Sequence, residues 1–270
     1  MAEPASVHLV QRVLSALILG TIVIVDTWVG GWSFSLLVGL IALLMAYEWG
    51  ELTRHRWNSP AMGRAAMIVT AVACVSVLLL GKVISMPILA VAIAVMGAGM
   101  ALFAQIREWP RSWLAFGVIY IALPVLSISW MRDIEPGGHI FVLWLFAIVW
   151  ATDSAAFFVG RAAGGPKLLA SVSPNKTWSG ALGGVLGAVI AGVAVALWIE
   201  LPFILGAAIL AVTVSVVAQI GDLYESWLKR GAGVKDSSQI IPGHGGVLDR
   251  LDGLLFAAPV FAMFAAAHPR

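Results

Sequence analysis

The residues best suited to chemistry lie near the C-terminal end of the chain, on a stretch with helical spacing. Two carboxylates, a hydroxyl and an ammonium follow one another there, as Asp222, Glu225, Ser226 and Lys229. Residues at i, i+3, i+4 and i+7 share one face of an α-helix, so these groups can meet one ligand. We expect Lys229 to act in catalysis and Ser226 to bind substrate.

A second acidic pair, Asp249 and Asp252, repeats the i, i+3 spacing where a later apolar segment begins. Two acidic pairs that converge on one membrane face can hold one or two hard cations, because Mg²⁺ takes oxygen ligands and often shares its coordination shell with phosphates. The predicted metal ligands are Asp222, Asp236, Asp249 and Asp252. The alternative is that each carboxylate only neutralises a neighbouring Lys or Arg.

The segment between the two pairs, residues 229–249, is rich in glycine and in positive charge. Its glycines allow backbone N–H groups to approach an anion without interference from a Cβ atom, and they are Gly231, Gly233, Gly243, Gly245 and Gly246. The surrounding cations are Lys229, Arg230, Lys235 and Arg250. This composition is typical of a site that holds a triphosphate and offsets its charge in the transition state, with the cations as catalytic residues and Gly245 and Gly246 in contact with substrate. A flexible basic loop that contacts lipid headgroups is the alternative.

His244 lies in the same segment and is a candidate for proton transfer. The nucleophile in an attack by a phosphate is already an anion, so a general base is scarcely needed. We therefore favour loop ordering or a hydrogen bond to phosphate for His244, with direct proton chemistry as its other candidate role.

A second polar stretch, residues 160–176, ends directly before an apolar segment. Ser173 followed by Pro174 predicts a helix start, with Ser173 as the N-cap and Pro174 in the first turn. The unpaired N–H groups of that helix end, with Lys176 and Thr177, are expected to form an anion site. We expect Lys176 to be catalytic, and we expect substrate binding from Lys167, Ser173 and Thr177.

These groups are set in a strongly apolar chain. Its 270 residues are 61% hydrophobic and 11% charged, with a mean hydropathy of +0.97, whereas an ordinary soluble domain carries about 25% charged residues. Long apolar runs without alternation indicate helices that cross about 30 Å of hydrocarbon, and they exclude a β-barrel. The predicted fold class is all-α, a polytopic helical membrane protein with about nine spans, at 13–29, 33–53, 64–80, 86–104, 112–131, 139–159, 177–199, 204–228 and 250–267.

The distribution of positive charge predicts the orientation. With the N-terminus in the cytoplasm, only Lys82, Arg132 and Arg270 of the 16 Lys and Arg residues lie outside, which is a strong positive-inside bias. Both polar loops then face the cytoplasm. We expect an integral protein of the bacterial inner (plasma) membrane with its active site on the cytoplasmic side.

The two halves of the sequence differ in character. Residues 1–131 form a plain half, expected to supply a scaffold, a lipid groove or a dimer surface, with Asp26 and Glu48 as interfacial side chains. Residues 132–270 form the expected catalytic half. Asp153 lies inside its sixth span, where a charge costs about 2.5 to 3.5 kcal/mol, so we expect it to face a polar chamber and bind substrate.

Composition also excludes several functions. Cys74 is the only cysteine, which rules out an internal disulfide and a cysteine metal cluster. The formal net charge of +2 gives no reason to expect nucleic-acid binding.

The stretch from Ser226 to Asp252 carries a long pattern of fixed spacing. Its residues are Ser226, Leu228, Lys229, Arg230, Lys235, Asp236, Ser238, Ile241, Pro242, His244, Gly245, Gly246, Val247, Asp249, Arg250, Leu251 and Asp252. Two upstream groups extend it: Asp153, Ala156, Gly160, Arg161, Lys167, Ser173, Pro174, Lys176 and Thr177, and then Gly221, Asp222, Leu223, Glu225 and Ser226. Together these residues resemble the phosphatidate cytidylyltransferase family, the CDP-diacylglycerol synthases, whereas the N-terminal half is similar only in hydropathy. The chain departs from common residues of that family at Phe157, Asn175 and Ser179, which affects the role of that loop and not the reaction.

The resemblance implies an activity. Members of that family convert CTP and phosphatidic acid to CDP-diacylglycerol and pyrophosphate with Mg²⁺, commonly as homodimers among membrane lipids. A second, monovalent cation is compatible with this chemistry. An oxygen of phosphatidate would then attack the α-phosphorus of CTP in a funnel formed by spans six to nine.

Three other functions stay open from the residues alone. A CDP-alcohol phosphotransferase also uses paired acids in a membrane, but its Asp-Gly-x-x-Ala-Arg pattern is absent from this sequence. A CTP-dependent polyprenol kinase would release CDP instead of pyrophosphate. A secondary transporter would also bury carboxylates in its spans, although the glycine-rich basic loop and the lack of a visible inverted repeat argue against it.

Overall fold

The computed structural model describes residues 5–241 and 245–267, with side chains from Leu17 onward. The described chain forms nine α-helices and one short β-hairpin, as α1 Ala5–Val29, α2 Gly31–Trp57, α3 Pro60–Leu80, α4 Met86–Ile106, α5 Arg111–Arg132, α6 Gly138–Ala163, β1 Lys167–Leu169, β2 Ser173–Thr177, α7 Trp178–Trp198, α8 Ile204–Gly231 and α9 Leu248–Ala267. Eight of them, α2 to α9, are long and apolar enough to cross a membrane, and α1 has a shorter apolar stretch at Leu17–Val29. The predicted all-α, polytopic membrane fold is confirmed.

Local chemistry explains where several helices begin and end. α3 starts with Pro60 directly after Ser59, whose Oγ accepts a hydrogen bond from the Met62 amide at 3.4 Å. α2 ends at Trp57 and is followed by the C-cap residue Asn58, which has a left-handed backbone with φ of 48°. These ends match the predicted boundaries to within a few residues.

The helix start predicted at Ser173 is wrong. Ser173–Thr177 form strand β2, which pairs antiparallel with β1 through Lys167 opposite Thr177 and Leu169 opposite Ser173. A residue before proline is biased toward extended backbone, which favours a strand here. The N-cap of α7 is Thr177, whose Oγ1 accepts a hydrogen bond from the Gly180 amide at 3.1 Å.

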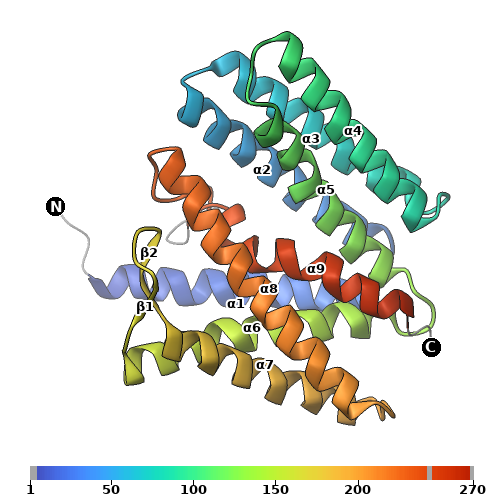
Figure 1. Cartoon of the computed structure of the whole chain (residues 1–270). Helices are drawn as coiled ribbons and strands as arrows, with labels where there is room; N and C mark the ends of the chain where they lie inside the picture. Colours follow the sequence, from blue (N-terminus) through green and yellow to red (C-terminus); the bar gives the residue numbers. More distant parts are fainter. Residues whose placement is uncertain (1–4, 242–244, 268–270) are drawn as a thin grey trace.

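The helices pack around two apolar cores (Figure 1). The first core joins α2–α5 and includes Trp49 and Leu114, with Leu228 and Leu248 contributed by α8 and α9. The second joins α6–α9 and includes Trp144. α8 and α9 therefore lie between the α2–α5 group and the α6–α7 pair, and each contributes to both cores.

Helix ends meet on two opposite sides of the bundle. On one side, Lys82 after α3 forms an ion pair with Asp133 after α5, and Arg132 donates hydrogen bonds to the carbonyls of Thr27 and Trp28 at 2.5 and 3.1 Å. On the other side, Arg56 of α2 lies over tryptophan rings from α5 and α8. Lys82 and Arg132 thus lie at the opposite helix ends from Arg56.

Close packing of α6 and α7 depends on small residues. At Gly180 an added Cβ atom would lie 2.8 Å from the Ala156 carbonyl oxygen, so only glycine permits this approach. Gly183, Gly184 and Gly187 face α6 in the same way. This glycine stripe therefore serves close helix packing, and it brings the Asp153 turn of α6 close to the start of α7.

Candidate active site

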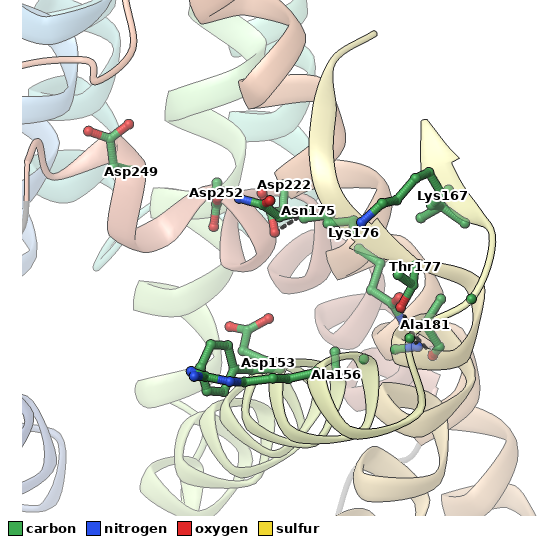
Figure 2. Close-up of a pocket in the computed structure, with 18 of the residues that line it drawn as sticks. Asp153, Ala156, Lys167, Asn175, Lys176, Thr177, Ala181, Asp222, Asp249 and Asp252 are labelled. Atoms are coloured by element: carbon green, nitrogen blue, oxygen red, sulfur yellow. Dashed lines mark hydrogen bonds and ion pairs between the residues drawn. The ribbon is translucent and has the colours of Figure 1, made fainter. Parts of the chain in front are cut away.

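A cavity of about 870 Å³ lies between α6, the β-hairpin, α8 and the start of α9 (Figure 2). Five aspartates and five cations line it, namely Asp153, Asp222, Asp236, Asp249, Asp252, Arg161, Lys167, Lys176, Lys229 and Arg250. Their formal charges cancel. A cavity of this composition attracts an anion only where the carboxylates are themselves neutralised or bridged.

Three of the aspartates come from different helices and face one another. Asp153 lies on α6, Asp222 on α8 and Asp252 on α9. The carboxylates of Asp153 and Asp252 each interact electrostatically with that of Asp222. Figure 2 shows Asp153 directed toward Asp222 and Asp252 across the cavity. Lys176 of β2 forms an ion pair with Asp222. The ammonium of Lys176 therefore partly offsets the mutual repulsion of the three carboxylates.

Asp249 belongs to a separate network at the edge of the cavity. Its Oδ1 lies 2.6 Å from Lys229 Nζ, and its Oδ2 accepts hydrogen bonds from the amides of Ser237 and Gly246 at 3.0 and 2.8 Å. Lys229 Nζ also lies 2.7 Å from Oε2 of the fully buried Glu225. Figure 2 shows Asp249 apart from Asp222 and Asp252. The network fixes the loop before α9 against α8.

The structure gathers most of the predicted site residues in this cavity. The cavity is lined by Asp153, Lys167, Lys176, Thr177, Asp222, Lys229, Asp236, Asp249, Arg250 and Asp252. Their individual roles stay predictions.

The remaining candidates lie elsewhere. Arg230 is exposed and donates a hydrogen bond to the Val234 carbonyl at 3.3 Å, and Lys235 lines a separate recess beside Glu51. Ser173, Ser226, Gly245 and Gly246 are not among the lining residues. His244 lies outside the described residues.

Sequence reasoning did not select three polar side chains that line the cavity, Arg161, Asn175 and Gln219. Gln219 precedes Asp222 by one helical turn on α8, so its spacing could have revealed it. Arg161 belongs to the family pattern but was not assigned a role. Asn175 lies in β2, beside Lys176, and only the hairpin explains its position.

The interpretation of Glu48 as an interfacial side chain is wrong. Glu48 of α2 is fully buried and accepts hydrogen bonds from the amides of Val247 and Leu248 at 2.8 and 2.7 Å. The hydroxyl groups of Ser237 and Ser238 donate to it at 2.9 and 2.5 Å. The first N–H groups of a helix lack partners within the helix, and the carboxylate of Glu48 satisfies that of Leu248, the first residue of α9.

Carboxylate oxygens are suitable ligands for Mg²⁺, and the cavity supplies them from three helices. Within the described part of the chain, no three Asp, Glu, His or Cys side chains are close enough to hold a metal ion by themselves. An ion that shares its coordination shell with substrate phosphates needs only one or two protein carboxylates. The facing pair of Asp222 and Asp252 fits that requirement.

A second, apolar cavity of about 480 Å³ adjoins the first. α1, α2, α5, α6 and α9 surround it with side chains such as Val23, Ile41 and Ile128. Asp153, Arg250 and Asp252 line both cavities. A polar chamber and an apolar chamber therefore share one charged wall.

The profile of the cytidylyltransferase family matches residues 10–268. The chain belongs to this family. It is 46% identical to the phosphatidate cytidylyltransferase of Brucella suis biovar 1 (strain 1330) over 261 residues, which cover 96% of this chain and 94% of the relative. The phosphatidate cytidylyltransferase of Synechocystis sp. is 32% identical, over 94% of this chain and 95% of its own length.

The match to the family extends beyond the C-terminal half. The N-terminal half, where the sequence patterns show a resemblance only in hydropathy, is included in both the profile match and the Brucella alignment. A protein from Haemophilus influenzae with the same name is 45% identical over 47% of this chain and 46% of its own length.

Proposed function

We propose that this chain transfers the cytidylyl group of CTP to phosphatidate at a membrane, releasing pyrophosphate and forming CDP-diacylglycerol. An oxygen of the phosphatidate phosphate attacks the α-phosphorus of CTP, and the bond from the α-phosphorus to the bridging oxygen of the β-phosphate breaks. The leaving pyrophosphate carries away the electron pair of that bond. The names of the relatives and the chemistry of the two cavities support this reaction.

The single observation that carries the proposal is the charged wall shared by the two cavities. A lipid that bears a phosphate needs an apolar space for its acyl chains, joined directly to a polar space for its headgroup. The apolar cavity provides the first, and the cavity lined by Lys176 and Arg250 provides the second. Asp153, Arg250 and Asp252 lie where the two substrates would meet.

The cations of the polar cavity have distinct proposed roles. Lys167 and Lys176 of the β-hairpin, with Arg161 at the end of α6, bind the triphosphate of CTP and offset its charge. Arg250, which lines both cavities, orients the phosphate of the lipid. The attacking phosphate is already an anion, so the mechanism requires no general base.

The carboxylates have a complementary role. Two anionic substrates cannot approach a wall of carboxylates unless positive charge is added, and the cations that line the cavity only balance its aspartates. We propose that Asp222 and Asp252 hold Mg²⁺. When bound, the ion would offset charge on the phosphate oxygens and stabilise the leaving pyrophosphate. Asp236, Asp249 and a second, monovalent cation stay predictions for the same site.

The proposed orientation places the polar cavity on the cytoplasmic side of a bacterial inner membrane, where CTP is available, and the proposed assembly is a homodimer. Because Cys74 is buried, single cysteines can report the topology. We expect an impermeant maleimide to label Val83→Cys in intact spheroplasts and Gln239→Cys only in inverted vesicles. Labelling of Gln239→Cys in intact spheroplasts would show that the orientation in the membrane is the opposite of the proposed one.

The deciding experiment incubates the purified protein in mixed micelles with CTP, phosphatidate and Mg²⁺, and identifies products by mass spectrometry. CDP-diacylglycerol and pyrophosphate in equal amounts are expected. Release of CDP with a newly phosphorylated lipid would indicate a kinase, and uptake into proteoliposomes without use of CTP would indicate a transporter. Full turnover in excess chelator would contradict the proposed metal.

A further inference from the structure

We propose that Glu48, a residue of the α2–α5 group, is a positioning residue for the active site, because it fixes the loop that carries the Asp249 network. The proposal rests on the proposed function for its kinetic consequence and on the hydrogen bonds of the structure for its geometry. Glu48 lines neither of the two cavities described above, so it acts through the loop and not through substrate.

The carboxylate of Glu48 binds the loop between α8 and α9, residues 232–247, at two places. Ser237 and Ser238 lie within the loop, and Val247 and Leu248 lie at its end, where α9 begins. All four donors are neutral hydroxyl or amide groups. Hydrogen bonds to an ionised acceptor are about twice as strong as those between neutral groups, so one buried carboxylate clamps two distant points of the loop.

The clamp leads directly to the cavity. Ser237 donates its hydroxyl to Glu48 and its backbone N–H to Asp249, at 2.9 and 3.0 Å. Gly246, next to Val247 of the clamp, donates its N–H to the same oxygen of Asp249 at 2.8 Å. Asp249 in turn holds Lys229. Movement of the loop away from Glu48 would therefore displace Asp249, Lys229 and the adjoining Arg250 together.

The close approach of the loop to α2 requires a residue without a side chain at position 246. A Cβ atom added to Gly246 would lie 2.7 and 2.8 Å from the two carboxylate oxygens of Glu48, and it would also collide with the hydroxyl of Ser237. Glycine at this position thus lets the backbone fold tightly over the carboxylate. The interface between α2 and the loop is built around the Glu48 side chain.

The test compares Glu48→Gln with the wild-type protein in the full chain. The amide keeps the shape of the side chain but presents an NH₂ donor to an N–H or O–H donor, so part of the clamp is lost. We expect kcat/KM for phosphatidate, per folded molecule, to fall at least ten-fold because Arg250 moves with the loop, while the KM for CTP, which residues outside the loop bind, changes less than two-fold. Hydrogen exchange should accelerate in residues 236–241 and 245–250 and not in α3 or α4. Glu51→Gln, one turn along α2 and paired with Arg54 at the surface, is the matched control.

A merely structural role predicts a different result. It would lower the fraction of folded, active protein and leave both KM values and the exchange of the loop unchanged in the folded molecules, which would overturn the proposal. If Glu48→Gln does not fold, Ser237→Ala removes one donor from the clamp and should cause a smaller change in the same direction; wild-type kinetics and exchange in that variant would also overturn it. If the wild-type protein makes no CDP-diacylglycerol, the proposed function fails, and the exchange measurement alone decides whether Glu48 holds the loop.

Discussion

The α2–α5 group and the α6–α9 group both bury polar side chains, but they use them in opposite ways. In the first group, the buried carboxylate of Glu48 has four hydrogen-bond donors, and the indole N–H of Trp113 donates to Thr53 at 2.9 Å. In the second group, Asp222 and Asp252 face each other across an open cavity. A buried carboxylate that is saturated with hydrogen bonds helps to specify the fold, whereas facing carboxylates whose repulsion a single Lys176 only partly offsets are suited to bind a cation.

This contrast predicts that substitutions in the acidic group affect activity most. Asp222→Asn or Asp252→Asn should lower kcat/KM by about 100-fold or more, a loss of the size seen when one charge-stabilising group is removed from an active site. Both variants should elute from a size-exclusion column at the same volume as the wild-type protein. Their remaining activity should reach half of its maximum at a higher Mg²⁺ concentration than that of the wild type. Asp133→Asn, on the side of the bundle where Lys82 lies, is the control with expected wild-type activity. An equal loss of activity in Asp222→Asn, Asp252→Asn and Asp133→Asn would contradict the contrast between the two groups of helices.

Asp249 should give an intermediate result because it connects the two groups. Asp249→Asn keeps the shape of the side chain but removes the charge that Lys229 contacts and one acceptor for the Ser237 and Gly246 amides. We expect a loss of activity of about 10-fold to 100-fold, the range found when a residue that orients a metal site is changed. Unfolding should also become easier by about 1 to 3 kcal/mol, since buried donors lose their partner. Wild-type activity would show that this network does not support the site.

The apolar cavity provides a test that separates the two substrates. Ile41→Trp on α2 should fill part of this cavity and raise the KM for phosphatidate by about 10-fold, within the range by which small changes of pocket shape alter specificity. The KM for CTP should stay unchanged. Leu43→Trp, on an exposed part of α2, serves as the matched control. A change in the KM for CTP alone would mean that the cavity does not hold acyl chains.

The smallest effect is expected from Arg56, which joins α2 to α5 and α8. Its guanidinium lies 4.6 to 5.2 Å from the ring centroids of Trp57, Trp113 and Trp227. Arg56→Lys should lower the free energy of unfolding by about 0.5 to 2 kcal/mol, because a compact ammonium cannot stack on three rings. Activity at low temperature should stay within two-fold of wild type, with Arg54→Lys as the control. A large loss of activity without loss of stability would place Arg56 in the site.

Much of the fold was predictable because the bilayer constrains it so strongly. A chain in hydrocarbon must satisfy its backbone hydrogen bonds within each segment, so long apolar runs had to be helices. Among the described residues, the eight predicted spans from 33–53 onward agree with the helices α2 to α9, whereas the first predicted span, 13–29, corresponds to a shorter apolar stretch of α1. The hairpin at residues 167–177 escaped prediction because it lies outside the apolar runs. There the Ser173–Pro174 pair is compatible with both a helix start and an extended strand.

The sequence predicted which residues belong to the site, but it did not predict which of these aspartates lie together. Spacing on α8 and α9 and the match to the family pattern selected Asp222, Asp249 and Asp252. Spacing could not tell that Asp249 would turn toward Lys229 and the loop amides, while Asp153 from α6 would join Asp222 and Asp252. The division depends on how the helices cross, and no local pattern encodes a crossing angle.

The sequence alone determined a helical membrane protein whose chemistry is acidic, basic and concentrated in the C-terminal half, because hydropathy, charge and motif spacing are local properties. The tertiary structure decided which carboxylates face the cavity and which stabilise the loop. It also brought Glu48 to a loop about 190 residues away in the chain, where it accepts hydrogen bonds from Ser237, Ser238, Val247 and Leu248. A buried carboxylate near the end of an apolar helix has the same local sequence whether it meets lipid headgroups or backbone amides, and only packing distinguishes the two.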